Sequence, residues 1–112
     1  LAGGFKWFLV LDFEATCNRG QQPNPQEIIE FPVLKVDAAT LDVTDTFHRY
    51  VHPVFNPKLS DFCTQLTGII QDMVDTESDF PVVMRPDHTY TYAHAVDAIF
   101  DTKPPICNFS YF

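Results

Sequence analysis

The chain has 112 residues, which suffices for one modest domain. Hydrophobic residues make up 46% of it and aromatic residues 14%, which excludes a disordered tail, and no apolar run approaches the length of a membrane-spanning helix. The formal net charge of -8 argues against tight binding to a phosphate backbone through lysine and arginine, but carboxylates that hold divalent metal ions can still meet phosphates.

Three strands are predicted in the first half of the chain. The apolar run over residues 8–13 lies between glycines and a polar loop, which predicts a central strand. EIIEFPVLKV, residues 27–36, predicts a second strand in which Pro32 requires a bulge or an edge position. Residues 37–45 read as a turn, and the alternation in residues 46–51 predicts a third strand. Short connections make an antiparallel meander the simplest arrangement.

Helical signals follow in the second half. Ser60 is placed as an N-cap in front of an acidic residue, and the helix that it starts continues to Gly68. A second short helix is expected over residues 69–74. The sequence SDFP, residues 78–81, matches another helix start with proline in the first turn. Residues 89–96 alternate weakly like a strand.

Asp12 and Glu14 end the first predicted strand, with one aromatic residue between them. Residues two apart in a strand face the same side, so the two carboxylates are neighbours that repel each other. Mg²⁺ or Mn²⁺ removes this repulsion, because such an ion binds carboxylate, water and phosphate oxygens together. Two ions would activate a water and stabilise the leaving oxygen in phosphodiester cleavage. We expect Asp12 to bridge the ions, and Glu14 to hold one of them and orient the attacking water.

A structural alternative remains for this acid pair. The two acids are equally compatible with an exposed edge strand, or with capping of the loop that follows. The entirely apolar strand before them favours the metal site, since a buried strand seldom ends in unpaired acids.

Four motifs occur in a fixed order along the chain: FLVLDFEATC, NPQEIIEFPVLKV, TFHRYVHP and LSDFCTQLTGIIQDMVD. Together they resemble the DEDDh 3′–5′ exonucleases. The most similar branch is the exoribonuclease group associated with RNA-interference regulation and with trimming of histone and ribosomal RNA ends. This resemblance covers residues 8–83. It implies an α/β, ribonuclease-H-like fold, with three antiparallel strands followed by helices. It also implies release of nucleoside monophosphates from a nucleic-acid 3′ end, in this branch RNA.

The resemblance assigns roles to individual residues. Asp12 and Glu14 match the first two of four metal-binding acids, which in the complete family site hold two Mg²⁺ or Mn²⁺ ions, and Glu14 also matches a catalytic position. Contacts with the terminal nucleotide are implied at or beside Glu14, Ala15, Thr16, Leu66 and Thr67. The turn around Thr67 is explained equally well as a glycine C-cap with two core residues.

The later motifs of the family are missing. No histidine is followed five residues later by aspartate, and from Arg85 onward the family pattern stops. We therefore divide the chain into residues 1–84, the N-terminal part of an exonuclease domain, and residues 85–112, a divergent segment of a truncated, alternatively spliced or frame-shifted product. The domain is then incomplete. We expect an exposed sheet edge and apolar surface, with marginal stability or association.

Two functions follow for such a chain. The first is a metal-dependent exonuclease that is poor or inactive by itself, because two metal ligands and the general base are missing. The second is a non-catalytic product that acts through binding of nucleic-acid ends or of protein. The cysteines Cys17, Cys63 and Cys107 lie far apart and form no paired motif, which predicts a reducing, intracellular compartment, the cytoplasm, the nucleus or both, without membrane association.

Overall fold

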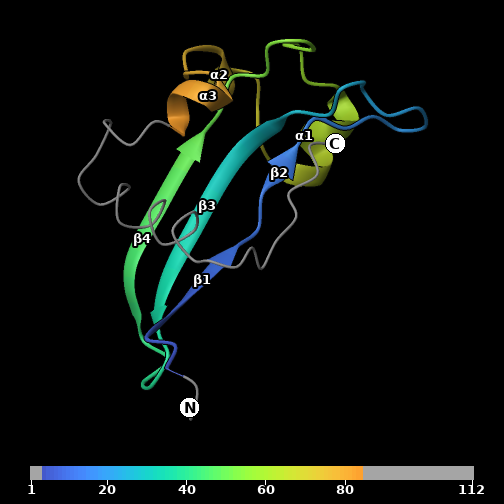
Figure 1. The fold of residues 1–112 in the computed structure, drawn as a ribbon. Helices are drawn as coiled ribbons and strands as arrows, with labels where there is room; N and C mark the ends of the chain where they lie inside the picture. Colours follow the sequence, from blue (N-terminus) through green and yellow to red (C-terminus); the bar gives the residue numbers. More distant parts are fainter. Residues whose placement is uncertain (1–3, 85–112) are drawn as a thin grey trace.

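The computed structural model describes residues 4–84, which form one antiparallel sheet with three short helices gathered at one end of it (Figure 1). The elements are β1 Trp7–Leu11, β2 Glu14–Ala15, β3 Ile28–Asp37, β4 Val43–Tyr50, α1 Asp61–Thr67, α2 Asp72–Asp75 and α3 Phe80–Val83. No helix within these residues is long and apolar enough to span a membrane. The strand predicted over residues 89–96 lies outside the described residues.

The long strand β3 is the centre of the sheet. It pairs antiparallel with β1 and β2 along one side and with β4 along the other (Figure 1). The predicted antiparallel arrangement is therefore confirmed. The prediction that residues 8–13 form the central strand is wrong for the described part of the chain, where β1 lies at an edge.

The strand predicted over residues 8–13 ends at Leu11 of β1, and a second short strand, β2, begins at Glu14. Cα partners on either side of the interruption are Leu11–Val33 and Glu14–Glu30, so both strands keep one register against β3. In that register Asp12 comes opposite Pro32, which has no N–H to donate to the ladder. Pro32 thus interrupts its neighbouring strand. No bulge lies at Pro32, since the register shifts are at Glu14/Ala15 and Lys35/Val36, but on the side of β1 and β2 this residue has no paired partner, which is locally the predicted edge position.

The turn between β3 and β4 is tighter than predicted, because both strands extend into residues 37–45. Asp37 organises it, since its Oδ1 accepts hydrogen bonds from the N–H groups of Ala39 at 2.8 Å and Thr40 at 3.0 Å. Leu41 then adopts a positive φ of 64°. The Asp37 side chain and the left-handed backbone of Leu41 therefore form this hairpin turn without a glycine.

Two helix starts and one helix end lie as predicted. The Ser60 hydroxyl accepts a hydrogen bond from the N–H of Cys63, and α1 ends at Gly68 with a left-handed φ of 76°. Asp79 caps α3 through the N–H of Val82. The short second helix, α2, begins later than the predicted residues 69–74.

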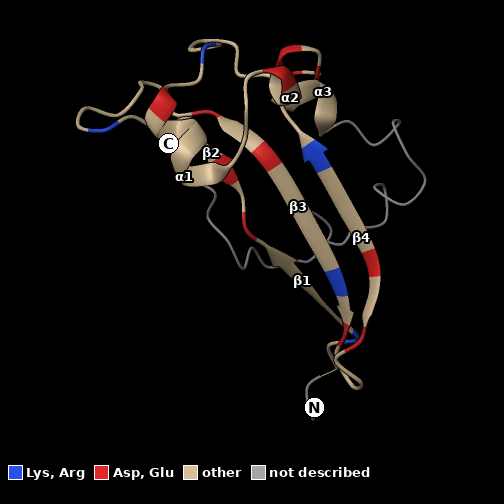
Figure 2. Ribbon diagram, turned by 180° about the vertical axis from the view of Figure 1, so that it is seen from behind, with Lys and Arg blue, Asp and Glu red and all other residues tan. Residues whose placement is uncertain are grey.

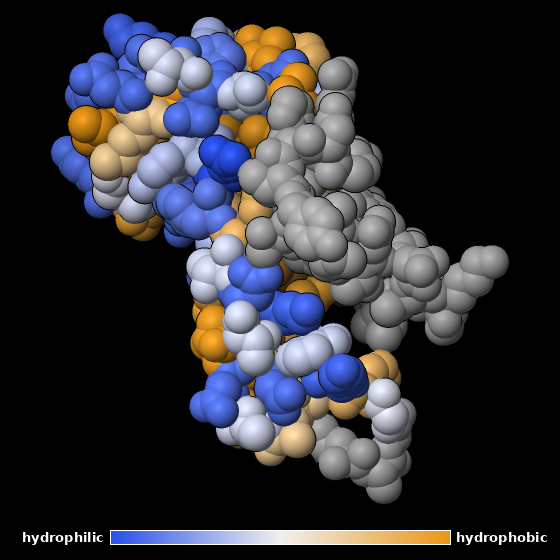
Figure 3. Space-filling view, turned by 90° about the vertical axis from the view of Figure 1, so that its left-hand side faces the viewer, coloured by the Kyte–Doolittle hydropathy of each residue, from blue (hydrophilic) through white to orange (hydrophobic). Residues whose placement is uncertain are grey.

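Buried side chains form two clusters under the helices. One joins α1 and α2 to the start of β3, and consists of Ile29, Leu59, Cys63, Ile69 and Val74. The other lies where α3 meets the sheet, and consists of Phe31, Val33, Val51 and Val83. Away from the helices the sheet keeps apolar surface, because Phe8 is 38% and Val10 is 49% exposed. Figure 3 shows hydrophobic residues reaching the surface along the sheet, as predicted.

Candidate active site

The two predicted metal ligands lie where β1 gives way to β2. Asp12 is exposed in the gap between the strands, and Glu14 is half-buried as the first residue of β2. The continuous register places both carboxylates on the sheet face that also carries Phe8 and Val10. Neither acid forms an ion pair with any other residue of the described chain. Among residues 4–84 they are therefore two carboxylates on one face without an ion-pair partner.

Such a pair fits a hard divalent cation. Within residues 4–84, no three histidine, cysteine, aspartate or glutamate side chains come together in a group able to hold a metal ion. Mg²⁺, however, is commonly held in enzymes by one or two carboxylates together with waters and substrate phosphates. Asp12 and Glu14 match that smaller ligand set.

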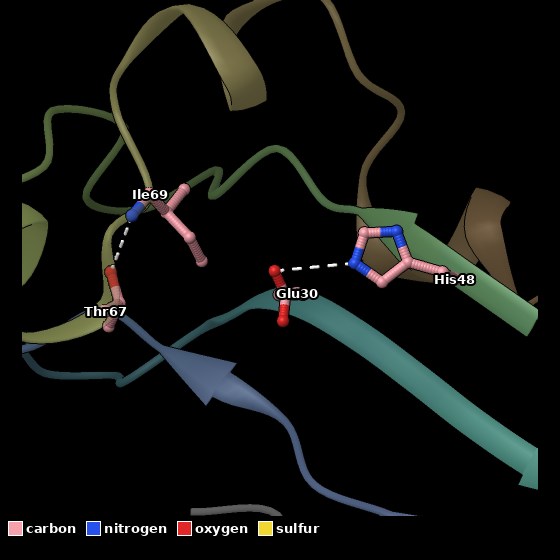
Figure 4. A network of polar contacts seen from close by, with 4 residues as sticks. All are labelled: Glu30, His48, Thr67 and Ile69. Carbon is pink, nitrogen blue, oxygen red and sulfur yellow. Dashed lines mark hydrogen bonds and ion pairs between the residues drawn. The ribbon is translucent and has the colours of Figure 1, made fainter.

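Sequence reasoning missed a third acid at this place, Glu30 of β3. It is the Cα partner of Glu14, and Figure 2 shows acidic positions on both β2 and β3 where the two strands run side by side. Glu30 differs from Glu14 because a histidine of the neighbouring strand lies beside its carboxylate. Its Oε2 lies 3.4 Å from Nε2 of His48 on β4 (Figure 4). Strand alternation alone could have found this neighbour only if the register were known.

Two histidines that lie four residues apart in the chain, His48 and His52, both contact neighbouring groups in the structure. His48 pairs with Glu30 and meets the Tyr50 ring edge-on, with centroids 4.9 Å apart. His52 lies beyond β4, and its Nδ1 is 3.1 Å from the carbonyl oxygen of Val74. These contacts give both residues a structural explanation, through packing and strand position.

Thr16 closes the long loop that follows β2. It is 3% exposed, its N–H donates to the Glu27 carbonyl at 2.8 Å, and its hydroxyl accepts from the Glu27 N–H at 2.9 Å. The amide of Gln26 also donates to the Thr16 carbonyl at 3.1 Å. Thr16 thus fixes the backbone just after Glu14 and Ala15, while its direct contact with a nucleotide stays a prediction.

Helix α1 is held against the exit of β2 by two side chains. The Ser60 hydroxyl donates to the Cys17 carbonyl at 2.7 Å, and the Cys63 thiol donates to the Ala15 carbonyl at 3.7 Å. These contacts bring together two segments that the sequence separates by more than forty residues. They join the predicted substrate contact Ala15 to the helix that carries Leu66 and Thr67.

Helix α1 ends in a glycine cap at Gly68 and carries an exposed side chain, Leu66, in its last turn. The Thr67 hydroxyl donates to the Cys63 carbonyl at 2.8 Å and accepts from the Ile69 N–H at 3.1 Å (Figure 4). Ile69 is 2% exposed, but Leu66 is 66% exposed, so only one of the two expected core residues is buried. Leu66 is therefore free to meet a ligand, as the alternative interpretation requires.

The thiols of Cys17 and Cys63 contact each other between the exit of β2 and α1. Cys17 packs against the cluster that contains Cys63, and both are free cysteines. Burial raises the pKa of Cys17 to about 11, assisted by the hydrogen bond with Cys63 and by the negative charge of Glu14. Cys17 therefore stays protonated at neutral pH and serves packing.

Glu27, which also contacts Thr16, fixes the loop after β4. Its carboxylate accepts hydrogen bonds from three successive N–H groups, at 2.6 Å from Val54, 3.0 Å from Phe55 and 2.9 Å from Asn56. This loop leads into Ser60 and α1. Glu27 thereby helps to position α1, in the same way as the hydrogen bonds of Thr16 help to position the end of β2.

This framework defines a class of protein. An antiparallel sheet with an acid pair at the junction of β1 and β2, and with α1 held against the exit of β2, is the arrangement of the N-terminal part of a ribonuclease-H-like domain. The chain belongs to the exonuclease family of the RNase T type, whose family model matches residues 9–110. Membership implies dependence on divalent metal ions. Because this match passes residue 84, the division into residues 1–84 and 85–112 stays a prediction.

The relatives are exoribonucleases. The chain is 55% identical over 80 residues to human "ERI1 exoribonuclease 3", which is 71% of this chain and 23% of that protein. It is 49% identical over 82 residues to human "3′-5′ exoribonuclease 1", which is 72% of this chain and 24% of that protein. The chain thus spans about a quarter of the length of these relatives.

Solved structures show the same fold. One is the nuclease domain of 3′hExo, a DEDDh family member, bound to rAMP. It matches with a TM-score of 0.67 and 48% identity, over 72% of this chain and 41% of that one. A 3′-exonuclease described in 3′-end-specific recognition of a histone mRNA stem-loop matches with a TM-score of 0.67 and 49% identity, over 71% and 28% of the two chains. The predicted ribonuclease-H-like fold and the DEDDh family are confirmed.

Proposed function

We propose that this chain is part of a 3′–5′ exoribonuclease that binds an RNA 3′ end and supplies the first half of its metal site. The observation that carries the proposal is the pair Asp12 and Glu14, two carboxylates on one sheet face that form no ion pair within the described part of the chain. Relatives named as exoribonucleases, one solved structure with rAMP and one concerned with a histone mRNA stem-loop support RNA as the substrate.

Each residue of the site has a role in this proposal. Asp12 and Glu14 bind divalent ions, Mg²⁺ or Mn²⁺, of which the complete family site holds two. When bound, such ions would supply positive charge to the scissile phosphate and would activate a water. Glu14 would orient the attacking water. Ala15 and the exposed Leu66 border the terminal nucleotide, and Thr16 and Thr67 hold the β2 exit and the end of α1 in place.

The isolated chain is expected to hydrolyse RNA weakly or not at all. The sequence holds no His-x-x-x-x-Asp element, so no general base of that type is available to take the proton of the attacking water. Two carboxylates also bind a second divalent ion poorly, because carboxylate ligands are needed to offset its charge. Binding of one ion and of a nucleotide is the activity that the described residues support. The free thiols Cys17 and Cys63 support an intracellular site of action.

Titration calorimetry with Mn²⁺ in the presence of a nucleoside monophosphate tests the metal site. We expect Asp12→Asn and Glu14→Gln each to weaken Mn²⁺ binding at least tenfold, since each removes one of two charged ligands. Asp72→Asn is the matched control, because Asp72 is an exposed acid on α2. Equal affinities in all four proteins would refute the site.

Trimming of a 3′-labelled single-stranded RNA tests whether the chain has exonuclease activity. Slow or undetectable trimming, with Mn²⁺ binding retained, is the expected result. Robust trimming that is abolished by Asp12→Ala would confirm exonuclease activity. It would also refute the expectation that the isolated chain is a weak or inactive enzyme. Binding of a nucleotide without metal, unaffected by either acid, would favour the alternative of a non-catalytic binding protein.

A further inference from the structure

Cys17 and Cys63 lie side by side although more than forty residues separate them in the sequence. Cys17 follows β2, and Cys63 lies in the first turn of α1, the helix beside the end of β2 (Figure 1). Both are free cysteines, and their thiols share a hydrogen bond. Cys63 is 0% exposed, whereas Cys17 is only half-buried. A reagent in solution can therefore reach one thiol of the pair but not the other.

Hydrogen bonds fix the main chain of both cysteines. The Ser60 hydroxyl donates to the Cys17 carbonyl at 2.7 Å and accepts from the Cys63 N–H at 3.0 Å, so one side chain links the two backbones. Just before Cys17, the Thr16 N–H donates to the Glu27 carbonyl at 2.8 Å. The fold therefore holds the two thiols in contact, and their approach does not depend on a chance motion of a loop.

We propose that Cys17 and Cys63 form a redox-modification site, which a low-molecular-weight disulfide such as glutathione disulfide converts into a reversible intramolecular disulfide. The bond requires Cβ atoms about 3.5–4.5 Å apart, a separation that two thiols already in contact reach with a small shift. In the reduced state, which the structure describes, both thiols fill the space between the exit of β2 and α1. In a reducing compartment such a disulfide is transient, as in redox-sensing proteins.

The difference in exposure sets the order of the reaction. The Cys17 thiolate attacks one sulfur of glutathione disulfide, which breaks that S–S bond, releases one glutathione and leaves a mixed disulfide on Cys17. The buried Cys63 thiolate then attacks the Sγ atom of Cys17 and expels the second glutathione. Both protein thiols are oxidised, the reagent is reduced to two glutathione molecules, and these molecules take up the two thiol protons.

Oxidation also changes the hydrogen bonds beside the candidate site. The Cys63 thiol donates to the Ala15 carbonyl at 3.7 Å, and it has no proton to donate once the disulfide has formed. A covalent link between the exit of β2 and α1 then replaces this hydrogen bond. The inference goes beyond the proposed function and does not depend on it, because it concerns only the two thiols and the backbone that holds them.

Mass spectrometry after incubation with glutathione disulfide tests the site. Cys107, which lies outside the described residues, is replaced by serine in every protein so that two thiols remain. Burial raises the pKa of Cys17 to about 11, so the incubation is run at about pH 8.5 to supply thiolate. We expect a monomer that has lost two hydrogen atoms and yields one Cys17–Cys63 linked peptide. Thiols that stay free, glutathione that stays on Cys17, or disulfides between copies as the main product would each overturn the proposal.

Two matched variants test the order of the reaction. In Cys63→Ser the second step has no thiol, so we expect one glutathione to accumulate on Cys17. In Cys17→Ser only the buried Cys63 remains, and we expect it to stay unmodified over the same time. Modification of Cys63 in the second variant as fast as that of Cys17 in the first would overturn the assignment of Cys17 as the thiol that reacts first.

A comparison of the native and the denatured chain measures how far the fold favours this bond, with Cys17 and Cys63 both unchanged. The ratio of disulfide to dithiol in glutathione buffers gives the effective concentration of one thiol at the other. We expect this concentration to be at least tenfold higher in native buffer than in concentrated guanidinium chloride, because the fold has already closed the loop between the two residues. By linkage, the disulfide then raises the folding equilibrium constant by the same factor. A smaller ratio would overturn the proposal.

Discussion

Removing the carboxylate of Glu27 is expected to release the loop that delivers α1 to the site. Three consecutive backbone N–H groups, those of Val54, Phe55 and Asn56, donate to this one side chain. No other hydrogen bond from these amides exists within the described residues. In Glu27→Ala all three donors lose their acceptor at once.

The size of the effect follows from these contacts. A hydrogen bond to a charged group contributes about 1.5–3 kcal/mol when it is buried. Val54 and Phe55 are 54% and 73% exposed, so water reaches their released amides and offsets most of the loss. We expect Glu27→Ala to lower the free energy of unfolding by about 2–3 kcal/mol in total. Glu27→Gln is expected to lower it by about half of that, because one amide oxygen still accepts.

Urea unfolding followed by circular dichroism measures this difference. With a slope of about 1 kcal/mol per molar urea, the midpoint falls by about 2 M for the alanine variant. Glu77→Gln is the matched control, since its carboxylate accepts no backbone hydrogen bond among the described residues. Midpoints for both Glu27 variants within error of this control would refute the role of Glu27 in holding the loop.

Three further predictions concern the helix end, a buried thiol and the hairpin. Gly68→Ala is expected to lower stability by about 1 kcal/mol in thermal melts, because φ is +76° while no atom lies within 4 Å of the added Cβ, and Gly68→Asn by less. The raised pKa of Cys17, about 11 against 9.0, predicts that stability is lost as pH rises from 9 to 11, and Cys17→Ser should flatten that part of the stability–pH profile. The Thr40 and then the Ala39 N–H lower the pKa of Asp37, so its contribution is present above the ordinary value of 3.8 and lost below it; Asp37→Asn should remove that acid-side loss.

Local patterns predicted the start and end of α1 and the start of α3, but not the start of α2. Ser60, Gly68 and Asp79 stand where the sequence placed caps, because a cap depends on one side chain or one φ angle and its immediate neighbours. The strands were less exact. A strand ends where its partner can no longer pair, and the gap after Leu11 depends on Pro32, twenty-one residues away.

The candidate site divides in the same way. The sequence predicted Asp12 and Glu14 as neighbours on one sheet face, because alternation in one strand is a local property, and their role as metal ligands stays a prediction. Glu30 was not found as their neighbour, since its position opposite Glu14 depends on how two strands align. The placement of α1 beside β2 also required the structure, because it depends on Ser60 and Cys63 reaching backbone carbonyls far away in the chain.

The sequence by itself determined the family, the antiparallel strands, the caps and the acid pair, all of which follow from short-range patterns and ordered motifs. Only the tertiary structure decided which of the described strands is central, which acid lies beside a histidine, and which helix packs against the exit of β2. The physical reason is that hydrogen-bond pairing and ion pairing across a sheet are set by register, and register is a property of two segments together.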